Sequence, residues 1–447
     1  MIPLTLGRPS AMASQRLRAT LRTLGADAPV ILRNSTSIWL SVGFNSALGF
    51  AFWWIADRQF SASAVGLAAA AISAMTLLGT AAMLGQGTAV MGEARDRTDP
   101  EDALLTTSLL APFVLGTLAG VLFAAFGWLL LPGLRVVASG PGTLALFGLG
   151  VGVTAATVVL DQGLVGFLLG QLQFGRNAAF AIAKLLLILA FSLLGRDRGG
   201  LLIYALWLAG NVLSLAPLLV AALRRGKLNR RGLPRWTLLR VLGLSGLKHH
   251  ALNLSLRAPG LALTLVVAAT LSAAATAYFY TAWMIASFGF AASSALATTL
   301  YAVGSGPPGQ MSHRVRFTVG LDLLAAVLFA AGLGVGAPLV LQFFGGAYAN
   351  AAGTCLRILG LGLFPYVVKD HYATIERAKG RTLHAASLVA AGGAAEVAGA
   401  ALGAHAAGLN GLAVGWEIAL IAEALAMLPS VLQTLFPENR TCHSADS

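Results

Sequence analysis

Two glutamates lie well inside long apolar stretches of this chain and are its first candidates for chemistry. Glu396 belongs to the stretch 383–405 and Glu423 to the stretch 409–432, each far from both ends of its stretch. A carboxylate in apolar surroundings has to be protonated, paired or in contact with water, because burying a bare charge is costly. The two residues are therefore candidates for binding a coupling cation or proton. The alternative is that each of them hydrogen-bonds a neighbouring helix.

Arg257 is the basic residue whose position is hardest to explain by anchoring at the membrane surface. It lies well inside the stretch 248–272, with Asn253 one helical turn before it and Pro259 just after it. We expect its side chain to reach a central cavity. There a guanidinium either holds a phosphate through paired hydrogen bonds or is neutralised by a structural carboxylate.

Two further cations in apolar stretches have simpler alternatives. Lys184 either pairs with Asp161 across the turn between two helices or extends its ammonium to the interface. Arg357 lies close enough to the outer end of its helix to extend in the same way. We predict that both residues, like Arg257 and Asn253, are candidates for binding the substrate.

Two aspartates need no functional explanation at this stage. Asp57 stands at the outer end of the first apolar stretch, and Asp322 stands near the cytoplasmic end of the stretch 317–343. Both need only reach the interface between lipid and water. We therefore predict no role for either of them in a binding site.

No combination of residues predicts catalysis, a metal site or a cofactor. His249 and His250 are adjacent, so they point in different directions on a helix, and no Cys, Asp or Glu stands at ligand spacing beside them. The Walker lysine motif, HExxH, GxSxG and the kinase signatures do not occur in the sequence. We therefore expect a protein that is not an enzyme and that takes energy from an ion gradient or from another protein.

The surroundings of these residues follow from the composition. Of 447 residues, 57% are hydrophobic and 11% are charged, and the mean hydropathy is +0.78. A soluble domain carries about 25% charged residues. The chain is therefore predicted to lie in a bilayer. At about 20 apolar residues per crossing it has room for roughly a dozen transmembrane helices and for no catalytic domain outside the membrane.

Apolar runs separated by Gly, Pro and charged residues predict an all-α polytopic membrane protein with about twelve transmembrane helices. We place the helices at about 35–56, 64–91, 103–131, 142–168, 177–194, 201–223, 248–272, 275–303, 317–343, 351–373, 383–405 and 409–432. Helices of the two halves begin at similar intervals. This correspondence predicts two parallel six-helix repeats around a central cavity, where a substrate would lie.

The predicted boundaries divide the chain into five parts. A cytoplasmic N-terminal segment covers 1–34 and is followed by a six-helix bundle over 35–223. A basic amphipathic linker over 224–247 lies along the cytoplasmic interface. The second six-helix bundle covers 248–432, and a cytoplasmic tail covers 433–447.

The excess of basic residues is explained by membrane topology. The sequence holds 30 Lys and Arg against 17 Asp and Glu, a formal charge of +13. Most of these cations fall in segments that the twelve-helix pattern places on the side of the N-terminus, so the positive-inside rule predicts that both termini are cytoplasmic. The stretch from Arg224 to Arg235 lacks interleaved aromatic residues. We expect it to contact anionic membrane lipids and not nucleic acid.

Glycines spaced four residues apart recur in three apolar stretches. Small residues at this spacing let helix backbones approach closely within a membrane. We therefore expect each pair to pack against a neighbouring helix and not to form a phosphate-binding loop. The pairs are Gly148 with Gly152, Gly332 with Gly336, and Gly411 with Gly415.

Three stretches resemble a known family of membrane proteins. They are FWWIADRQFSASAVGLAAAAISAMTLLGTAAMLGQGTAV from Phe52 to Val90, AYFYTAWMIASFGFAASSALATTLYA from Ala277 to Ala302, and FFGGAYANAAGTCLRILGLGLFPYVV from Phe343 to Val368. They are similar to helices 1 and 2, helix 8, and helix 10 of the polysaccharide-export, Wzx-like branch of the multidrug/oligosaccharidyl-lipid/polysaccharide flippase superfamily. The family often has Arg where Asp57 stands, and an acidic residue where Val303 stands.

The resemblance implies a function. Such proteins form two six-helix bundles around a cavity in the bacterial cytoplasmic membrane and move lipid-linked oligosaccharides, the precursors of polysaccharide or lipopolysaccharide, by alternating access. A glycan polymerase or glycosyltransferases would be partners. Two alternatives stay open: a cation-coupled multidrug antiporter of the same superfamily, and a non-transporting membrane scaffold for polysaccharide assembly.

Overall fold

The computed structural model describes residues 44–87, 90, 101–167, 169–193, 199–224, 237–303 and 311–436, and within these ranges it contains helices and no strand. A helix over 44–59 comes first. The others are α2 (Ala62–Ala82), α4 (Glu101–Phe126), η1 (Gly127–Leu129), η2 (Pro132–Ala138), α5 (Pro141–Gly166), α6 (Gly170–Ser192), α7 (Gly200–Leu213), α8 (Ala216–Arg224), α9 (Thr237–Thr270), α10 (Ala273–Val303), α11 (Met311–Gln342), α12 (Gly346–Leu361), α13 (Leu363–Ala378) and α14 (Thr382–Leu435).

The predicted all-helical membrane fold is confirmed. In the described part of the chain, nine helices are long and apolar enough to cross a membrane. The last of them, α14, is two helices joined at a non-helical break at Ala407 and Gly408. The bent pair α12 and α13 and the helix over 44–59 supply the remaining two segments of the predicted twelve.

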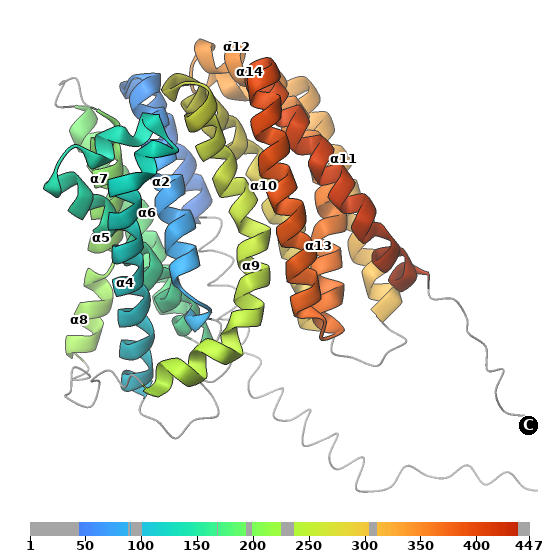
Figure 1. The fold of residues 1–447 in the computed structure, drawn as a ribbon, viewed down its shortest axis with the longest axis horizontal. Helices are drawn as coiled ribbons and strands as arrows, with labels where there is room; N and C mark the ends of the chain where they lie inside the picture. Colours follow the sequence, from blue (N-terminus) through green and yellow to red (C-terminus); the bar gives the residue numbers. More distant parts are fainter. Residues whose placement is uncertain are drawn as a thin grey trace, which may run out of the picture.

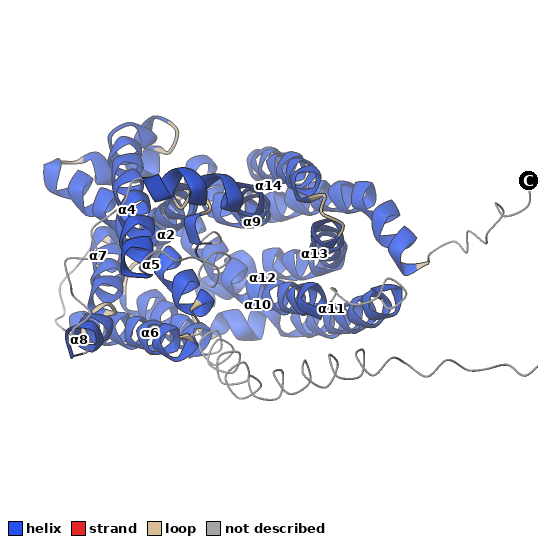
Figure 2. Ribbon diagram, turned by 90° about the horizontal axis from the view of Figure 1, so that it is seen from below, coloured by secondary structure: helices blue, strands red, loops and turns tan. Residues whose placement is uncertain are grey.

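The helices form two groups that lie side by side (Figure 1). The N half contains the helix over 44–59, α2, α4, η1, η2 and α5 to α8, and the C half contains α9 to α14. Viewed along the helices, the two groups meet where α2 lies beside α9 and α10 (Figure 2). We call this surface the seam.

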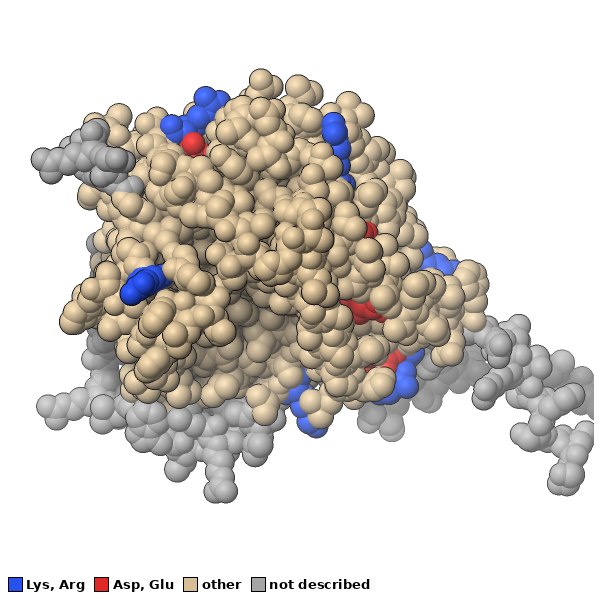
Figure 3. Space-filling view, turned by 45° about the horizontal axis from the view of Figure 1, so that its top comes forward, with Lys and Arg blue, Asp and Glu red and all other residues tan. Residues whose placement is uncertain are grey.

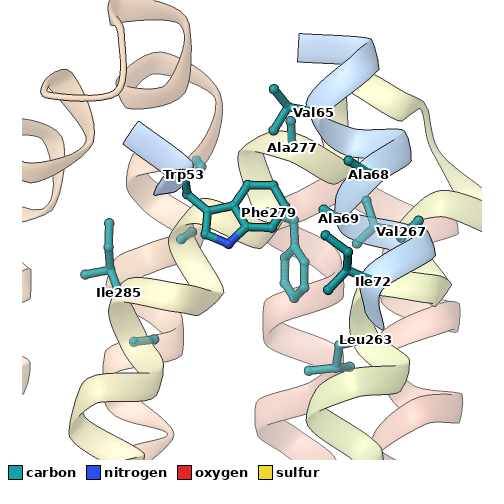
Figure 4. Packing of buried hydrophobic residues seen from close by; sticks show 14 of the residues in the cluster. Trp53, Val65, Ala68, Ala69, Ile72, Leu263, Val267, Ala277, Phe279 and Ile285 are labelled. Carbon is teal, nitrogen blue, oxygen red and sulfur yellow. The ribbon is translucent and has the colours of Figure 1, made fainter. Parts of the chain in front are cut away.

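The seam is an apolar contact built on small side chains of α2. Alanines on this helix let α9 and α10 approach closely, so larger residues from those helices fill the remaining space (Figure 4). A side chain on Gly66 would overlap the backbone carbonyl of Ala273 at the start of α10. Buried residues at the seam include Val65, Ala68, Ala69 and Ile72 of α2, Leu263 and Val267 of α9, and Ala277 and Phe279 of α10.

Large apolar side chains face outward from the bundle, as expected for helices in lipid. Leu118, Leu328, Val335 and Leu402 are all more than half exposed. Charged side chains are few on the face shown in Figure 3. The predicted linker over 224–247 lies partly outside the described residues, and its later part is helical because α9 already begins at Thr237.

Two of the three glycine pairs pack as predicted. Gly148 and Gly152 of α5 lie against the backbone of α4, and Gly411 and Gly415 lie against the preceding arm of α14. The prediction is wrong for Gly332 and Gly336, because a methyl group added at either position would meet no atom within 4 Å. Spacing alone does not show whether a neighbouring helix faces a glycine pair.

We expect Gly403→Leu to destabilise the fold by about 3 kcal/mol, because its side chain would overlap the backbone carbonyl of Gly411 in the other arm of α14. Gly332→Leu is the matched control, since that position is open. Equilibrium unfolding of the purified proteins in micelles measures the difference. Equal stability of the two variants would contradict the close packing of the two arms.

Candidate functional site: a cavity between the two halves

A cavity of about 270 Å³ lies between the two halves. The N half contributes hydroxyl groups to its wall, and the C half contributes aromatic and charged side chains. The lining residues include Thr76 and Thr80 of α2, Arg257, Pro259 and Gly260 of α9, Trp283, Ser287 and Phe290 of α10, Tyr366 and Lys369 of α13, and Glu396 and Trp416 of α14.

Arg257 reaches this cavity from α9. It is exposed, and no carboxylate among the described residues lies within ion-pair distance of its guanidinium. Gly260, one turn further along, leaves room for the indole of Trp283, because a side chain there would collide with the ring. The local sequence therefore places a guanidinium beside an aromatic wall.

Asn253 does not line the cavity between the halves. It lines a smaller one of about 140 Å³, where Arg257 also contributes. The side-chain carbonyl of Asn253 accepts a hydrogen bond of 2.7 Å from Nη2 of Arg377. This oxygen is therefore already bonded within the C half, which competes with the predicted role of Asn253 in substrate binding.

Lys369 holds both candidate glutamates. Its Nζ lies 2.5 Å from Oε1 of Glu396 and 2.9 Å from Oε2 of Glu423, and all three side chains are buried. Nε1 of Trp416 donates to the other oxygen of Glu396 at 2.6 Å. A side chain at position 392 would overlap the carboxyl group of Glu423, so the glycine there leaves room for this carboxyl group. We call Lys369, Glu396 and Glu423 the triad.

Sequence reasoning missed Lys369. The residue lies near the cytoplasmic end of the predicted helix 351–373, where a lysine that extends to the interface is the ordinary interpretation. The sequence does contain one signal for this cluster. Lys369 lies one turn inside the end of its helix, and the next two helices each carry a glutamate. The structure brings Glu396 and Glu423 to one site, and their role in ion coupling stays a prediction.

Lys184 does not pair with Asp161. Instead Oδ2 of Asp161 lies 2.7 Å from Nη2 of Arg176, the residue just before the predicted helix 177–194. Because α6 begins at Gly170, Arg176 lies on the helix and faces α5. Lys184 is buried beside three aromatic rings.

Arg357 does not line the cavity between the halves. Its side chain is exposed, and its Nε donates to the carbonyl of Gly334 on α11 at 2.9 Å. Its place outside this cavity gives no support to the predicted contact with a substrate.

Asp57 and Asp322 both differ from expectation, because each is buried. Oδ2 of Asp322 accepts a hydrogen bond of 2.7 Å from Ser293. Asp57 of the N half accepts from two hydroxyls of the C half: Tyr348 at 2.6 Å and Thr281 at 2.9 Å. Hydroxyl partners on distant helices, which periodicity cannot locate, replace the predicted contact with the interface.

The same end of the seam has two more hydrogen bonds between the halves. Nε1 of Trp54 and Nε of Arg58 both donate to the carbonyl of Phe343, at 2.8 and 3.0 Å. Together with the bonds to Asp57, they fasten the first helix of the N half to the C half. We call this group of contacts the Asp57 latch.

Within the described residues, no group of three or more His, Cys, Asp or Glu is placed to hold a metal ion. The polar groups at the cavity are the charged side chains of Arg257, Lys369 and Glu396 together with hydroxyls. Together with aromatic walls, they suit recognition of an amphipathic molecule.

Comparison with solved structures identifies the architecture. An inward-facing multidrug resistance MATE family transporter of the MOP superfamily matches with a TM-score of 0.70, covering 90% of this chain and 96% of that chain at 17% identity. The chain has the MATE transporter fold. An outward-facing MATE transporter of the MOP superfamily matches with a TM-score of 0.64 at 17% identity, covering 92% of this chain and 96% of that one.

A third similar structure is a MOP superfamily transporter from Pyrococcus furiosus, described as having a binding pocket of reverse polarity that suggests a different function. It matches with a TM-score of 0.58 at 15% identity, covering 91% of this chain and 95% of that one. No family model and no curated protein matches the chain. The MOP superfamily of these neighbours is the multidrug/oligosaccharidyl-lipid/polysaccharide superfamily that the three sequence stretches resemble. The neighbours do not specifically support its polysaccharide-export branch.

Proposed function

We propose that this chain is a membrane transporter that works by alternating access. The observation that carries the proposal is the cavity between two helical halves whose seam is fastened at one end by the Asp57 latch. A seam held by a few hydrogen bonds can separate at one end while the apolar contact elsewhere persists. MATE transporters with similar folds, described as inward-facing and outward-facing, support this proposal.

For the substrate we propose an amphipathic molecule with an anionic group, in the first place a lipid-linked oligosaccharide with a pyrophosphate. Arg257 is exposed in the cavity beside Trp283, so a phosphate bound there would gain paired, charge-assisted hydrogen bonds. Apolar and aromatic walls suit the neighbouring part of a lipid. A glycan polymerase or glycosyltransferases would then be partners in the bacterial cytoplasmic membrane.

The second candidate is a cation-coupled multidrug antiporter, and the names of the structural neighbours favour it over the flippase. Buried carboxylates in the C half are consistent with it. In the first candidate, Arg257 attracts the substrate; in the second, it repels a cationic drug. The charge of the transported molecule therefore separates the two.

We further propose that an ion gradient drives transport through the triad. The sequence has no nucleotide-binding motif. In the described conformation, Lys369 supplies the positive charge that the two glutamates need. A proton or cation that takes over this charge would release Lys369 and bias one conformation over the other.

We expect Arg257→Ala to slow movement of an undecaprenyl-pyrophosphate-linked oligosaccharide at least about tenfold, because the phosphate loses its guanidinium partner. The measurement uses the purified protein in liposomes and follows exposure of the labelled glycan on the opposite leaflet. Arg257→Lys should retain part of the rate. Arg357→Ala is the matched control, since this arginine lies outside the cavity.

The same liposomes distinguish the candidates. The antiporter is favoured if the protein takes up a cationic dye only under an imposed ion gradient, and if Arg257→Ala takes up the dye as fast as the wild type or faster. Movement of neither molecule by the folded protein would contradict the transport proposal itself. Normal glycan movement in Arg257→Ala at normal protein levels would remove Arg257 from the substrate site.

A further inference from the structure

A second cavity, of about 440 Å³, lies within the N half. Its walls come from the helix over 44–59 and from α2, α5, α6 and α7. Thr76 of α2 lines both this cavity and the one between the halves, so α2 borders both. Neither the sequence resemblance nor the proposed transport assigns a role to the inner chamber, which we call the N-half cavity.

Lys184 brings a positive charge to the N-half cavity. Its Nζ lies 3.9 Å from the ring centroid of Trp207, 4.6 Å from that of Phe180 and 5.6 Å from that of Phe52. The residue is 3% exposed, and no carboxylate among the described residues lies within ion-pair distance. Aromatic faces stabilise the charge, but the ammonium still has three N–H groups that need acceptors.

Packing fixes this lysine in place. A side chain on Gly210 of α7 would collide with the backbone and Cβ of Lys184, so α6 and α7 are in close contact at this point. The close contact sets Trp207 of α7 directly beside the ammonium. The three rings close to Nζ exclude water from it, which strengthens its attraction for an anion in the cavity.

The other polar groups in the wall of the N-half cavity have fewer hydrogen bonds than they can make. Asp161 Oδ1, Arg176 Nε, Thr154 Oγ1 and Gln173 Oε1 are buried and have no hydrogen-bond partner among the described residues. Each such atom costs about 1–3 kcal/mol unless a partner is supplied. The charge of Asp161 offsets that of Arg176 at 2.7 Å, so the positive charge of Lys184 is left over.

We propose that the N-half cavity binds a small polyhydroxylated anion, either a sugar acid or a sugar phosphate. Its anionic group lies at Lys184, and its hydroxyls donate to and accept from the unpartnered atoms of Asp161, Thr154 and Gln173. A cation is excluded by the ammonium. A purely apolar molecule is excluded because it leaves these polar atoms unpaired.

Isothermal titration calorimetry on the purified full chain tests this proposal without any transport. The probes are D-glucuronate and glucose 1-phosphate, with glucose as the neutral counterpart and glucosamine as the cationic one. We expect both anions to bind at least about tenfold more tightly than glucose, and glucosamine to bind no better than glucose.

Variants place the binding in the N-half cavity. Lys184→Met keeps the apolar stem of the lysine and should reduce the affinity for both anions to that for glucose. Lys184→Arg should retain the preference for anions. Thr154→Val should weaken anions and glucose by the same factor, because it removes a hydroxyl contact. Arg357→Met is the matched control on a cation elsewhere in the membrane.

The proposal is overturned if glucose binds as tightly as the anions, if no probe binds the wild-type protein, or if folded Lys184→Met keeps the anion preference. The comparison among probes on the wild-type protein decides the matter even if a variant does not fold. A protein that binds the anions but moves neither substrate in liposomes contradicts the proposed transport and leaves this inference standing.

Discussion

Replacing Lys369 with methionine should destabilise the protein by about 3–5 kcal/mol, because two buried carboxylates then lose the ammonium group that holds them. Methionine keeps most of the apolar stem, so little packing is lost. This change removes a large part of the stability of an ordinary domain. Equilibrium unfolding in micelles measures the free energy, and the reduced amount of folded protein in membranes is a second readout.

The companion variants separate charge from packing. Lys369→Met combined with Glu396→Gln and Glu423→Gln removes both unpaired charges and should recover most of the lost stability. Lys379→Met is the matched control, because that lysine is partly exposed and bonds Glu376 at 3.4 Å, a contact worth little. A triple variant as unstable as Lys369→Met would show that packing and not charge is the reason.

The triple variant also tests ion coupling. Once the glutamates cannot take up a proton or cation, transport in liposomes should no longer depend on the imposed gradient. Gradient dependence that persists in the folded triple variant would exclude the triad from coupling, and the glutamates would then have a structural role alone.

Asp57→Ala should open the latched end of the seam and raise the population of the separated form at least about tenfold. The variant removes the acceptor for Tyr348 and Thr281, and hydrogen bonds to a charged group contribute about 1.5–3 kcal/mol each. Spin labels at Leu130 of the N half and Leu339 of the C half report the change, since both side chains are exposed. Pulsed electron paramagnetic resonance should show a second, longer distance.

Two control variants show whether the loss of the hydrogen bonds to Asp57 causes the change in distance. Tyr348→Phe removes one donor only and should give a smaller shift in the same direction. Gln342→Ala changes the last residue of α11, whose side chain takes no part in the latch contacts, so its distances should match the wild type. An unchanged distance distribution in Asp57→Ala would mean that the apolar seam alone holds the halves together.

The sequence was a good guide to where helices run. Apolar runs and their breaks predicted twelve segments, and even the return at Ala407 and Gly408 falls between two predicted stretches. The reason is that lipid requires about 20 apolar residues per crossing, which leaves a strong signal in composition. The same periodicity indicates little about which face of a helix meets a neighbour, so Gly332 and Gly336 were predicted to pack and do not.

The candidate site was predictable in part for the same physical reason. Arg257 was found because a guanidinium deep in an apolar stretch is costly, and the structure does place it at the cavity wall. The partner of Glu396 was not found, because Lys369 lies near a helix end and pairs across 27 residues of chain. Asp57 was missed because its two hydroxyl partners lie more than 200 residues away.

The composition of the triad has a consequence for the membrane voltage. One ammonium with two carboxylates carries one net negative charge, and a single proton or monovalent cation brings it to zero. Under the proposed coupling, each transport cycle therefore moves one such ion. An elementary charge that crosses the full membrane gains about 2.3 kcal/mol per 100 mV. At about 100 mV the voltage alone would then supply enough energy to concentrate a neutral solute about fiftyfold. In an exchange of the ion for the solute, a solute with one positive charge would make the cycle insensitive to voltage, whereas a solute with one negative charge would double its dependence on voltage.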